Sequence, residues 1–462
     1  MRAVKSVWAL VALAMLSRLL LLPDSPFEVD SVLLTRAVED FDPTQMRPHP
    51  PGYAGVVFLG KLLFFLEPGA ALRVVSALSI GPMVWGTWKI AEEVDADPLI
   101  AAALVACNPV AWLYGLFENA YAPGSAVGVL TIWAVLRCRR SEGPSAPALV
   151  GVLMGITGAL RPSLLVFMAP AVVYGTWRRL HFVVAGALAP TALWLGWSAV
   201  ASGGLGAYLS AVDHQFEWIR EGHPDHWRWH QVHHLAVYAL QAVAGGLLLL
   251  PWLRRMDRVL LLWMAVPFGF HLFVYVAKAG YLLPYLPALA VLLATTKAPR
   301  ALQIGAPVLS ALIFLLARPV DVELDRTPKL NFAEKTWEQR ITGELSFLST
   351  ASLQRIRLQQ RANASYVALL QPEVQPGRTT VVWVDRWDAA IAGHMLTGVD
   401  VVDTRGDRLQ VPAEGTRVLY LGWESPEGFT PIQREGYGAW MRDVTIQDLP
   451  LTIGRLEAVA VF

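Results

Sequence analysis

Charged residues are scarce in this sequence. They make up 16% of its 462 residues, against about one quarter in an ordinary soluble protein. With 55% hydrophobic residues and a mean hydropathy of +0.43, the composition argues against a fully soluble or a disordered chain. A net charge of +1 argues against a nucleic-acid binder, which needs a basic field. Two cysteines, Cys107 and Cys138, exclude a disulfide scaffold, and neither has a partner at metal-site spacing.

The few charges are unevenly distributed. Residues 318–462 hold 35 of the 75 charged residues, while the rest of the chain has long apolar runs. We therefore expect an integral membrane domain over residues 1–317 and a soluble domain over residues 318–462.

Long apolar runs predict about 11 transmembrane helices, since a helix needs about 20 apolar residues to cross the hydrocarbon core. They cover residues 3–22, 72–91, 98–116, 121–137, 146–160, 163–177, 181–201, 233–252, 257–276, 280–296 and 301–317. The first run lacks a convincing cleavage site and is interpreted as an uncleaved anchor.

Clusters of Lys and Arg predict the orientation, because such clusters favour the cytoplasmic side. All clusters fall inside if residues 50–66, which open with Pro-Pro-Gly, lie as a helix on the outer surface and do not cross. The expected protein is multi-pass in the cytoplasmic (inner) membrane, with its C-terminal domain extracytoplasmic.

Ionisable residues within membrane helices mark function by default because they are costly there. In the expected topology Arg18, Glu118, Arg161 and Lys278 lie near the outer ends of their helices. The alternative is that the cationic side chains snorkel to water. All four residues are expected near the outer face of the membrane. A transporter would instead place its polar groups near the midplane.

The first outer loop carries acidic residues. Glu28 and Asp30 would project to the same side of an extended segment but diverge on a helix. Such carboxylates act as a base or hold a divalent cation; the alternative is a solvated acidic loop. Glu39, Asp40 and Asp42 are typical of a cap or turn before Pro43.

The second large outer loop is rich in histidine. On a helix, His226, His230 and His233 or His234 would share one face, and histidines at this spacing bind zinc. No Glu stands in the metalloprotease position, so an interfacial helix with Trp and His at the headgroups is the preferred interpretation. His214 and Gln215 are better candidates for contacts with a sugar or phosphate.

The C-terminal part predicts a small α/β domain. Residues 379–384, 399–402 and 416–421 are β-branched runs typical of strands, and residues 456–462 predict another strand. Helices are expected over residues 346–362, 387–397 and 431–441. Residues 385–388 follow a strand end, where α/β sheets bind ligands, but an ordinary polar loop is the preferred interpretation. No glycine-rich phosphate loop is present.

Four stretches in order resemble the C-type (GT-C) glycosyltransferases, and most closely the protein O-mannosyltransferase and lipid A aminoarabinose transferase group. The first is the opening helix with its early outer-loop acid and Arg47-Pro48-His49-Pro50-Pro51-Gly52-Tyr53. The second is Phe117-Glu118-Asn119-Ala120-Tyr121-Ala122-Pro123, and the third is Gly158-Ala159-Leu160-Arg161-Pro162-Ser163. The fourth is Lys278-Ala279-Gly280-Tyr281-Leu282-Leu283-Pro284-Tyr285-Leu286-Pro287. The resemblance covers about residues 1–317.

This resemblance implies inverting transfer of a sugar from a polyprenyl-phosphate donor to a glycan, lipid or protein acceptor at the outer face of the membrane. It assigns the catalytic base to Asp30, with Glu28 as the second candidate. It places His49 and Lys278 at the donor phosphate, with Arg161 as a further candidate. We expect the other substrate contacts at Tyr53, Glu118, Tyr121, His214 and Tyr281. The acidic pair here is Glu-x-Asp instead of two adjacent acids, which leaves the base and any divalent metal open.

The residue types suit this chemistry independently of the resemblance to the GT-C family. A phosphate leaving group needs cations for its developing charge, and a hydroxyl nucleophile needs a carboxylate to take its proton. Two alternatives stay open: a transporter or flippase of lipid-linked sugars, and a non-catalytic assembly protein.

Overall fold

The computed structural model describes residues 2–221, 227–253, 256–273, 278–317, 351–374, 380–384, 389–403, 417–422, 430–435, 437–443, 451–452 and 455–456. The chain forms two compact units. The helical unit comprises Met1–Pro23 and Leu33–Ile356, and the sheet unit comprises Asp24–Val32 and Arg357–Phe462. The predicted domain boundary at residue 317 stays a prediction, because residues 318–350 lie outside the described part of the chain.

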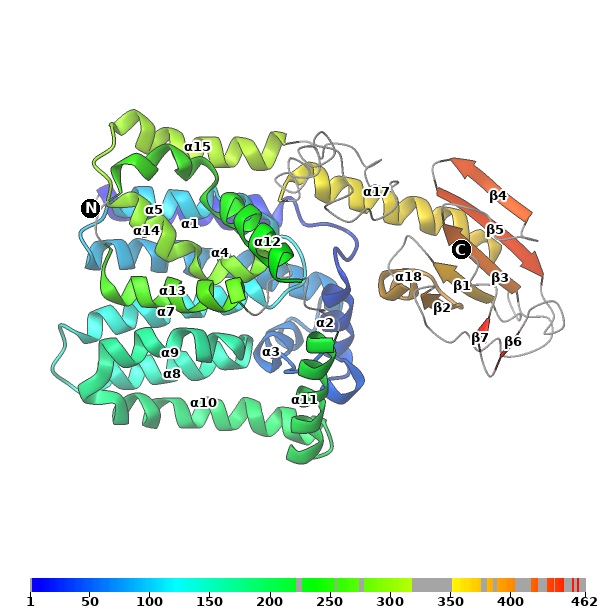
Figure 1. Cartoon of the computed structure of the whole chain (residues 1–462), viewed down its shortest axis with the longest axis horizontal. Coiled ribbons are helices and arrows are strands. Elements are labelled where there is room, and N and C mark those ends of the chain that lie inside the picture. The colour runs from blue at the N-terminus through cyan, green and yellow to red at the C-terminus, as the bar shows by residue number, and fades with distance from the viewer. Residues whose placement is uncertain are drawn as a thin grey trace. The chain divides into compact units, whose positions relative to one another are not determined.

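The helical unit consists of apolar helices, most of which run side by side along one direction (Figure 1). They are α1 (Arg2–Leu19), α3 (Ala54–Leu62), α4 (Pro68–Glu93), α5 (Pro98–Ala106), α6 (Pro109–Tyr114), α7 (Tyr121–Cys138), α8 (Ser145–Leu160), α9 (Ser163–Thr176), α10 (Leu180–Ala201), α11 (Leu205–Glu221), α12 (Trp227–Val243), α13 (Arg258–Phe273), α14 (Leu286–Ala294) and α15 (Arg300–Leu316). The helix α2 (Val29–Glu39) begins in the sheet unit and ends in the helical unit.

Four of the described helical segments are long and apolar enough to cross a membrane: Pro68–Glu93, Tyr121–Cys138, Ser163–Ala201 and Leu235–Trp252. The third of these bends at the short 3-10 helix η2 (Trp177–Arg179), which separates α9 from α10. The predicted spans 163–177 and 181–201 are separated at the same place. The predicted number of crossings stays a prediction.

Three predicted spans are interrupted within the described residues. The run 98–116 divides into α5 and α6 because Pro109 starts a new helix and the side chain of Asn108 accepts hydrogen bonds from the backbone amides of Val110 and Ala111. The run 233–252 changes from α12 to the 3-10 helix η3 (Ala244–Trp252), and the run 280–296 contains the 3-10 helix η4 (Ala279–Tyr285) before α14.

The segment at residues 50–66 contains only a short helix. The nine residues of α3 span about 14 Å at 1.5 Å per residue, which is too short to cross about 30 Å of hydrocarbon. This length agrees with the expectation that the segment does not cross.

Small residues allow α8 and α10 to pack closely. A Cβ atom on Gly151 would overlap the carbonyl oxygen of Val183, and one on Gly155 would lie 2.5 Å from the ring of Pro190. Small residues at this spacing are typical of membrane helix pairs, because they let backbones approach without side chains between them.

The sheet unit contains a five-stranded sheet with the order β2-β1-β3-β5-β4. Its strands are β1 (Thr380–Val384), β2 (Asp400–Asp403), β3 (Arg417–Gly422), β4 (Thr430–Glu435) and β5 (Tyr437–Asp443). The strand β1 pairs in parallel with β2 and β3, while β5 is antiparallel to β3 and β4. A separate two-stranded sheet pairs β6 (Leu451–Thr452) with β7 (Arg455–Leu456).

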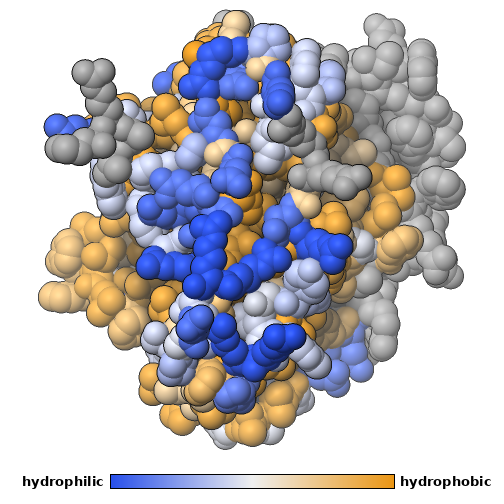
Figure 2. Space-filling view, turned by 90° about the vertical axis from the view of Figure 1, so that its left-hand side faces the viewer, coloured by the Kyte–Doolittle hydropathy of each residue, from blue (hydrophilic) through white to orange (hydrophobic). Residues whose placement is uncertain are grey.

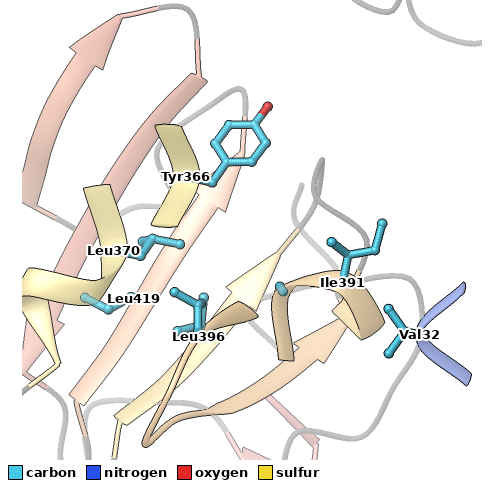
Figure 3. Close-up of a cluster of buried hydrophobic side chains, with 8 residues drawn as sticks. Val32, Tyr366, Leu370, Ile391, Leu396 and Leu419 are labelled. Carbon is cyan, nitrogen blue, oxygen red and sulfur yellow. The ribbon is translucent and has the colours of Figure 1, made fainter. Parts of the chain in front are cut away.

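One hydrophobic core joins the sheet to helices α17 (Leu353–Leu370) and α18 (Ala389–Met395). Val382 of β1 and Leu419 of β3 are paired in register and fully buried. Figure 3 shows Leu370, Leu396 and Ile391 around these strands, with Val32 of α2 at the edge of the same cluster. Val32 therefore fixes the segment Asp24–Val32 to the sheet unit.

The structure confirms the three predicted strands in residues 379–421 and the helix expected near residues 387–397, and α17 overlaps the helix expected over 346–362. The helix predicted over residues 431–441 is wrong, because this stretch forms β4 and β5. The pairing of β5 with β3 outweighs the local sequence pattern of residues 431–441, since cross-strand partners decide the stability of a strand more than intrinsic preference does. The predicted strand at 456–462 lies almost entirely outside the described residues.

Candidate functional site

Arg161 and Tyr121 meet at one end of the helical unit. Arg161 caps the C-terminus of α8, and Tyr121 is the first residue of α7. The guanidinium carbon of Arg161 lies 3.7 Å from the centre of the Tyr121 ring and 5.4 Å from that of Tyr281. Both distances are within the range of cation–π attraction, so the two rings hold the guanidinium in place.

Lys278 joins this group from the residue before η4. Its ammonium nitrogen lies 5.7 Å from the centre of the Tyr121 ring. Tyr121 also contacts the rings of Tyr114 and Tyr281, with centroids 5.1 and 5.5 Å away. We refer to Arg161, Lys278, Tyr114, Tyr121 and Tyr281 as the arginine–tyrosine cluster.

The loop 47–53 brings Tyr53 and His49 to the same region. Tyr53 interacts electrostatically with Arg161, and its ring lies 5.2 Å from the imidazole of His49 in an edge-on arrangement. The Nδ1 atom of His49 lies 2.9 Å from the carbonyl oxygen of Pro50, which only accepts, so Nδ1 carries the proton.

Contacts from other elements shape this loop. Tyr208 of α11 donates a hydrogen bond of 2.8 Å to the carbonyl oxygen of Pro51, and burial raises the pKa of Tyr208, which keeps this donor protonated. Gly52 has φ +104°, and a Cβ there would lie 3.1 Å from the ring of Pro43, so the loop needs glycine at this position. The predicted turn before Pro43 is confirmed, because Asp42 caps η1 (Pro43–Gln45) by accepting from the amide of Thr44.

Two residues near the cluster have no role in the sequence prediction. His271 of α13 is fully buried, and its ring lies 5.2 Å from that of Tyr281 and 6.2 Å from that of Tyr285. Tyr285 also interacts electrostatically with Arg161. His271 stands inside a predicted span, and that signal, an ionisable residue within an apolar helix, was sufficient to find it.

Glu118 has a different environment. Its fully buried carboxylate forms an ion pair with Arg73 of α4, and Arg73 also lies 3.7 Å from the carboxylate of Glu67. Arg73 was also missed, although it is a charge inside the predicted span 72–91. The ion pair indicates that Glu118 fixes α4 to the α6–α7 connection.

The histidine-rich region is only partly described. His214 lies on the exposed side of α11. The side chains of His226, His230, His233 and His234 lie outside the described residues, as do residues 385–388, so the zinc hypothesis and the loop interpretation stay predictions. Within the described residues, no three His, Cys, Asp or Glu side chains come together as a metal site would require.

The acidic pair belongs to the sheet unit. Glu28 precedes α2 and Asp30 lies in its first turn, both half-buried, so the two carboxylates do not lie on one extended segment. Asn363 of α17 donates hydrogen bonds to the hydroxyl of Ser25 at 3.1 Å and to the carbonyl of Pro26 at 3.3 Å. Together with the buried Val32, these contacts hold the acidic segment at both of its ends.

The electrostatics of the cluster favour an anion. Arg161 is 5% exposed, and within the described residues it forms no ion pair with a carboxylate. Tyrosine rings and hydroxyls surround it instead. A guanidinium stays protonated in proteins, and burial strengthens its attraction for a negative group. The arrangement therefore suits a phosphate.

No family model and no curated protein matches this chain. Its structure is similar to that of ArnT from Cupriavidus metallidurans in the apo state, with a TM-score of 0.56 and 14% identity over 96% of this chain and 98% of that one. The structure of ArnT from the same organism bound to undecaprenyl phosphate gives a TM-score of 0.54 and 14% identity, over 94% of this chain and 97% of that one. At this identity the similarity shows a shared fold, and that fold is the GT-C fold which the sequence resemblance implied.

Proposed function

We propose that this chain is a membrane glycosyltransferase that takes its sugar from a polyprenyl-phosphate donor. The observation that carries the proposal is Arg161, a buried cation held by tyrosines without a carboxylate partner among the described residues. A structure with the same fold is described as bound to undecaprenyl phosphate, which supports a lipid phosphate as the ligand.

In this proposal the arginine–tyrosine cluster receives the donor phosphate. Arg161 offers up to five N–H donors in a planar fork that matches phosphate oxygens, and Lys278 adds a second positive charge beside the same Tyr121 ring. Both cations offset the negative charge that develops on the phosphate as the bond to the sugar breaks. Tyr53 and His49 would complete the phosphate side of the site.

The proposed base is Asp30, with Glu28 as the second candidate. A carboxylate takes the proton of the acceptor hydroxyl while the hydroxyl oxygen bonds to the sugar and the lipid phosphate leaves, which inverts the sugar carbon. The support is the resemblance of the first loop together with the anchoring of its segment by Asn363 and Val32. Anchoring at both ends reduces the motion of the carboxylate, and positioning is a large part of catalysis.

The test is transfer by the purified full-length protein in detergent. It is incubated with a panel of polyprenyl-phosphate sugars and with membrane extracts as acceptor, and the products are measured by mass spectrometry. The expected result is an acceptor heavier by one sugar and release of polyprenyl phosphate, both strongly reduced with Arg161→Gln at a donor concentration below saturation.

The same panel distinguishes the alternative of a flippase of lipid-linked sugars. In proteoliposomes a flippase moves an intact donor between leaflets without producing free polyprenyl phosphate. Movement of intact donor with no product in any arm would contradict the proposal.

A further inference from the structure

A second group of cations lies at the opposite end of the helical unit. The last residue of α7, Cys138, is 17 residues after Tyr121, which is about 26 Å along a helix. Figure 2 faces this end and shows hydrophilic side chains gathered in a band across it. Arginines there come from the C-terminal end of α7 and from η2, which follows α9.

An open cavity of about 340 Å³ lies among these arginines. Its lining includes Arg139, Arg178 and Arg179, together with the aromatic side chains of Tyr174 and Trp177. At about 30 Å³ per molecule the cavity has room for about ten waters, which is sufficient for a small charged headgroup.

The three arginines are only partly neutralised. Arg139 pairs with Asp257 at 2.9 Å. Arg179 donates to the backbone carbonyls of Cys138 and Ser141, and these neutral acceptors leave its positive charge in place. Arg178 is exposed, and in the part of the chain that the structure describes it makes no hydrogen bond or ion pair. The lining therefore carries excess positive charge.

Tryptophans place this cavity at the level of a membrane surface. Trp177 in its lining is 70% exposed. At the same end, the rings of Trp133 and Trp85 contact each other. The guanidinium carbon of Arg137 lies 5.6 Å from the centre of the Trp133 ring. The ammonium nitrogen of Lys89 lies 5.9 Å from the centre of the Trp85 ring. Tryptophan paired with cations is typical of the boundary between hydrocarbon and water, which is the depth of lipid phosphates.

We propose that this cavity binds the phosphate headgroup of an anionic phospholipid. The guanidinium groups pair with the phosphate oxygens, and the exposed ring of Trp177 packs against the lipid beside the headgroup. Among the described residues that line the cavity there is no carboxylate, so the lining offers no opposite charge to the ammonium of a zwitterionic lipid. The site is separate from the arginine–tyrosine cluster and does not depend on the proposed transfer reaction.

The experiment measures lipid binding to the purified full-length protein by native mass spectrometry. The protein, in detergent, is titrated with phosphatidylglycerol, with phosphatidylcholine, and with phosphatidylglycerol in the presence of excess inorganic phosphate. We expect preferential binding of phosphatidylglycerol that inorganic phosphate does not displace. Arg178→Gln should weaken this binding about five-fold, the effect of one cation near a lipid surface.

Arg140→Gln is the matched control. Arg140 is the neighbour of Arg139, its side chain is 65% exposed and pairs with Glu93, and it does not line the cavity. Its removal should change binding less than about two-fold, since a neutralised cation outside the cavity contributes little. Equal losses in the two variants would overturn the proposal in favour of general surface charge. Unchanged binding in Arg178→Gln, or displacement by inorganic phosphate, would also overturn it. Thermal unfolding of both variants checks that they are folded.

Discussion

The guanidinium of Arg161 lies 3.7 Å from the centre of the Tyr121 ring. The two residues come from the C-terminus of one helix and the N-terminus of another, so neither helix forms the site alone. The contact shields a buried cation without cancelling its charge, and an anion that reaches it gains most of the electrostatic attraction. This relationship underlies the first prediction.

Arg161→Gln should weaken donor binding about 10- to 100-fold, because hydrogen bonds to a charged group contribute about 1.5–3 kcal/mol. The loss should appear mainly as a higher KM for the polyprenyl-phosphate sugar. Arg47→Gln is the control, since Arg47 is an exposed arginine paired with Asp40 at 2.6 Å. Equal KM values in both variants would show that Arg161 does not bind the donor.

Asp30→Asn should reduce transfer by about 10²–10⁴-fold, the usual contribution of a general base, with little change in donor binding. Asp24→Asn provides the control, because Asp24 is an exposed carboxylate on the same segment and should retain activity. Glu28→Gln distinguishes the two candidates. If Glu28→Gln loses transfer and Asp30→Asn keeps it, the base is Glu28.

Asn363→Ala should lower the activity by disturbing the segment that carries the acidic pair. The substitution removes both hydrogen bonds to Ser25 and Pro26, and leaving these buried groups without a donor costs about 1–3 kcal/mol. We expect a lower kcat with an unchanged KM for the donor. Ser365→Ala, an exposed position on the same helix, should behave as wild type in the same kinetic measurement.

Glu118→Gln should destabilise the folded protein by about 3–5 kcal/mol, because it leaves Arg73 as a buried cation without its main partner. Thermal unfolding in detergent measures the effect. Glu92→Gln removes one partner of the Lys89–Glu92 pair, in which the carboxylate is 40% exposed, and should cost at most about 1 kcal/mol. A comparable loss in both variants would contradict the structural role assigned to Glu118.

Gly151→Ala should destabilise the packing of α8 against α10 by about 1–3 kcal/mol, because the added methyl group would overlap the backbone of Val183. Gly196→Ala is the control, since a Cβ at that glycine meets nothing within 4 Å. It should unfold at or above the wild-type temperature because alanine favours a helix over glycine. Identical melting temperatures for the two variants would argue against close packing at Gly151.

Part of this fold is predictable from the sequence because it depends on local signals. Apolar runs indicate the helices, and β-branched runs indicate β1, β2 and β3. Asn108 and Pro109 also end one helix and begin the next by local chemistry, although the apolar run alone did not indicate this break. The helix prediction for residues 431–441 was wrong for the opposite reason, since these strands depend on the pairing of β5 with β3 and of β4 with β5.

The sequence by itself determined that the chain has long apolar helices, a charged C-terminal part, and ionisable residues at helix ends. Only the tertiary structure decided what those residues contact. The cations of Arg161 and Lys278 both lie near the ring of Tyr121. Glu118 forms an ion pair with Arg73, and the acidic segment is hydrogen-bonded to α17. The physical reason is that a charge in an apolar environment must find a partner, and which partner lies within reach depends on the packing of helices distant in sequence.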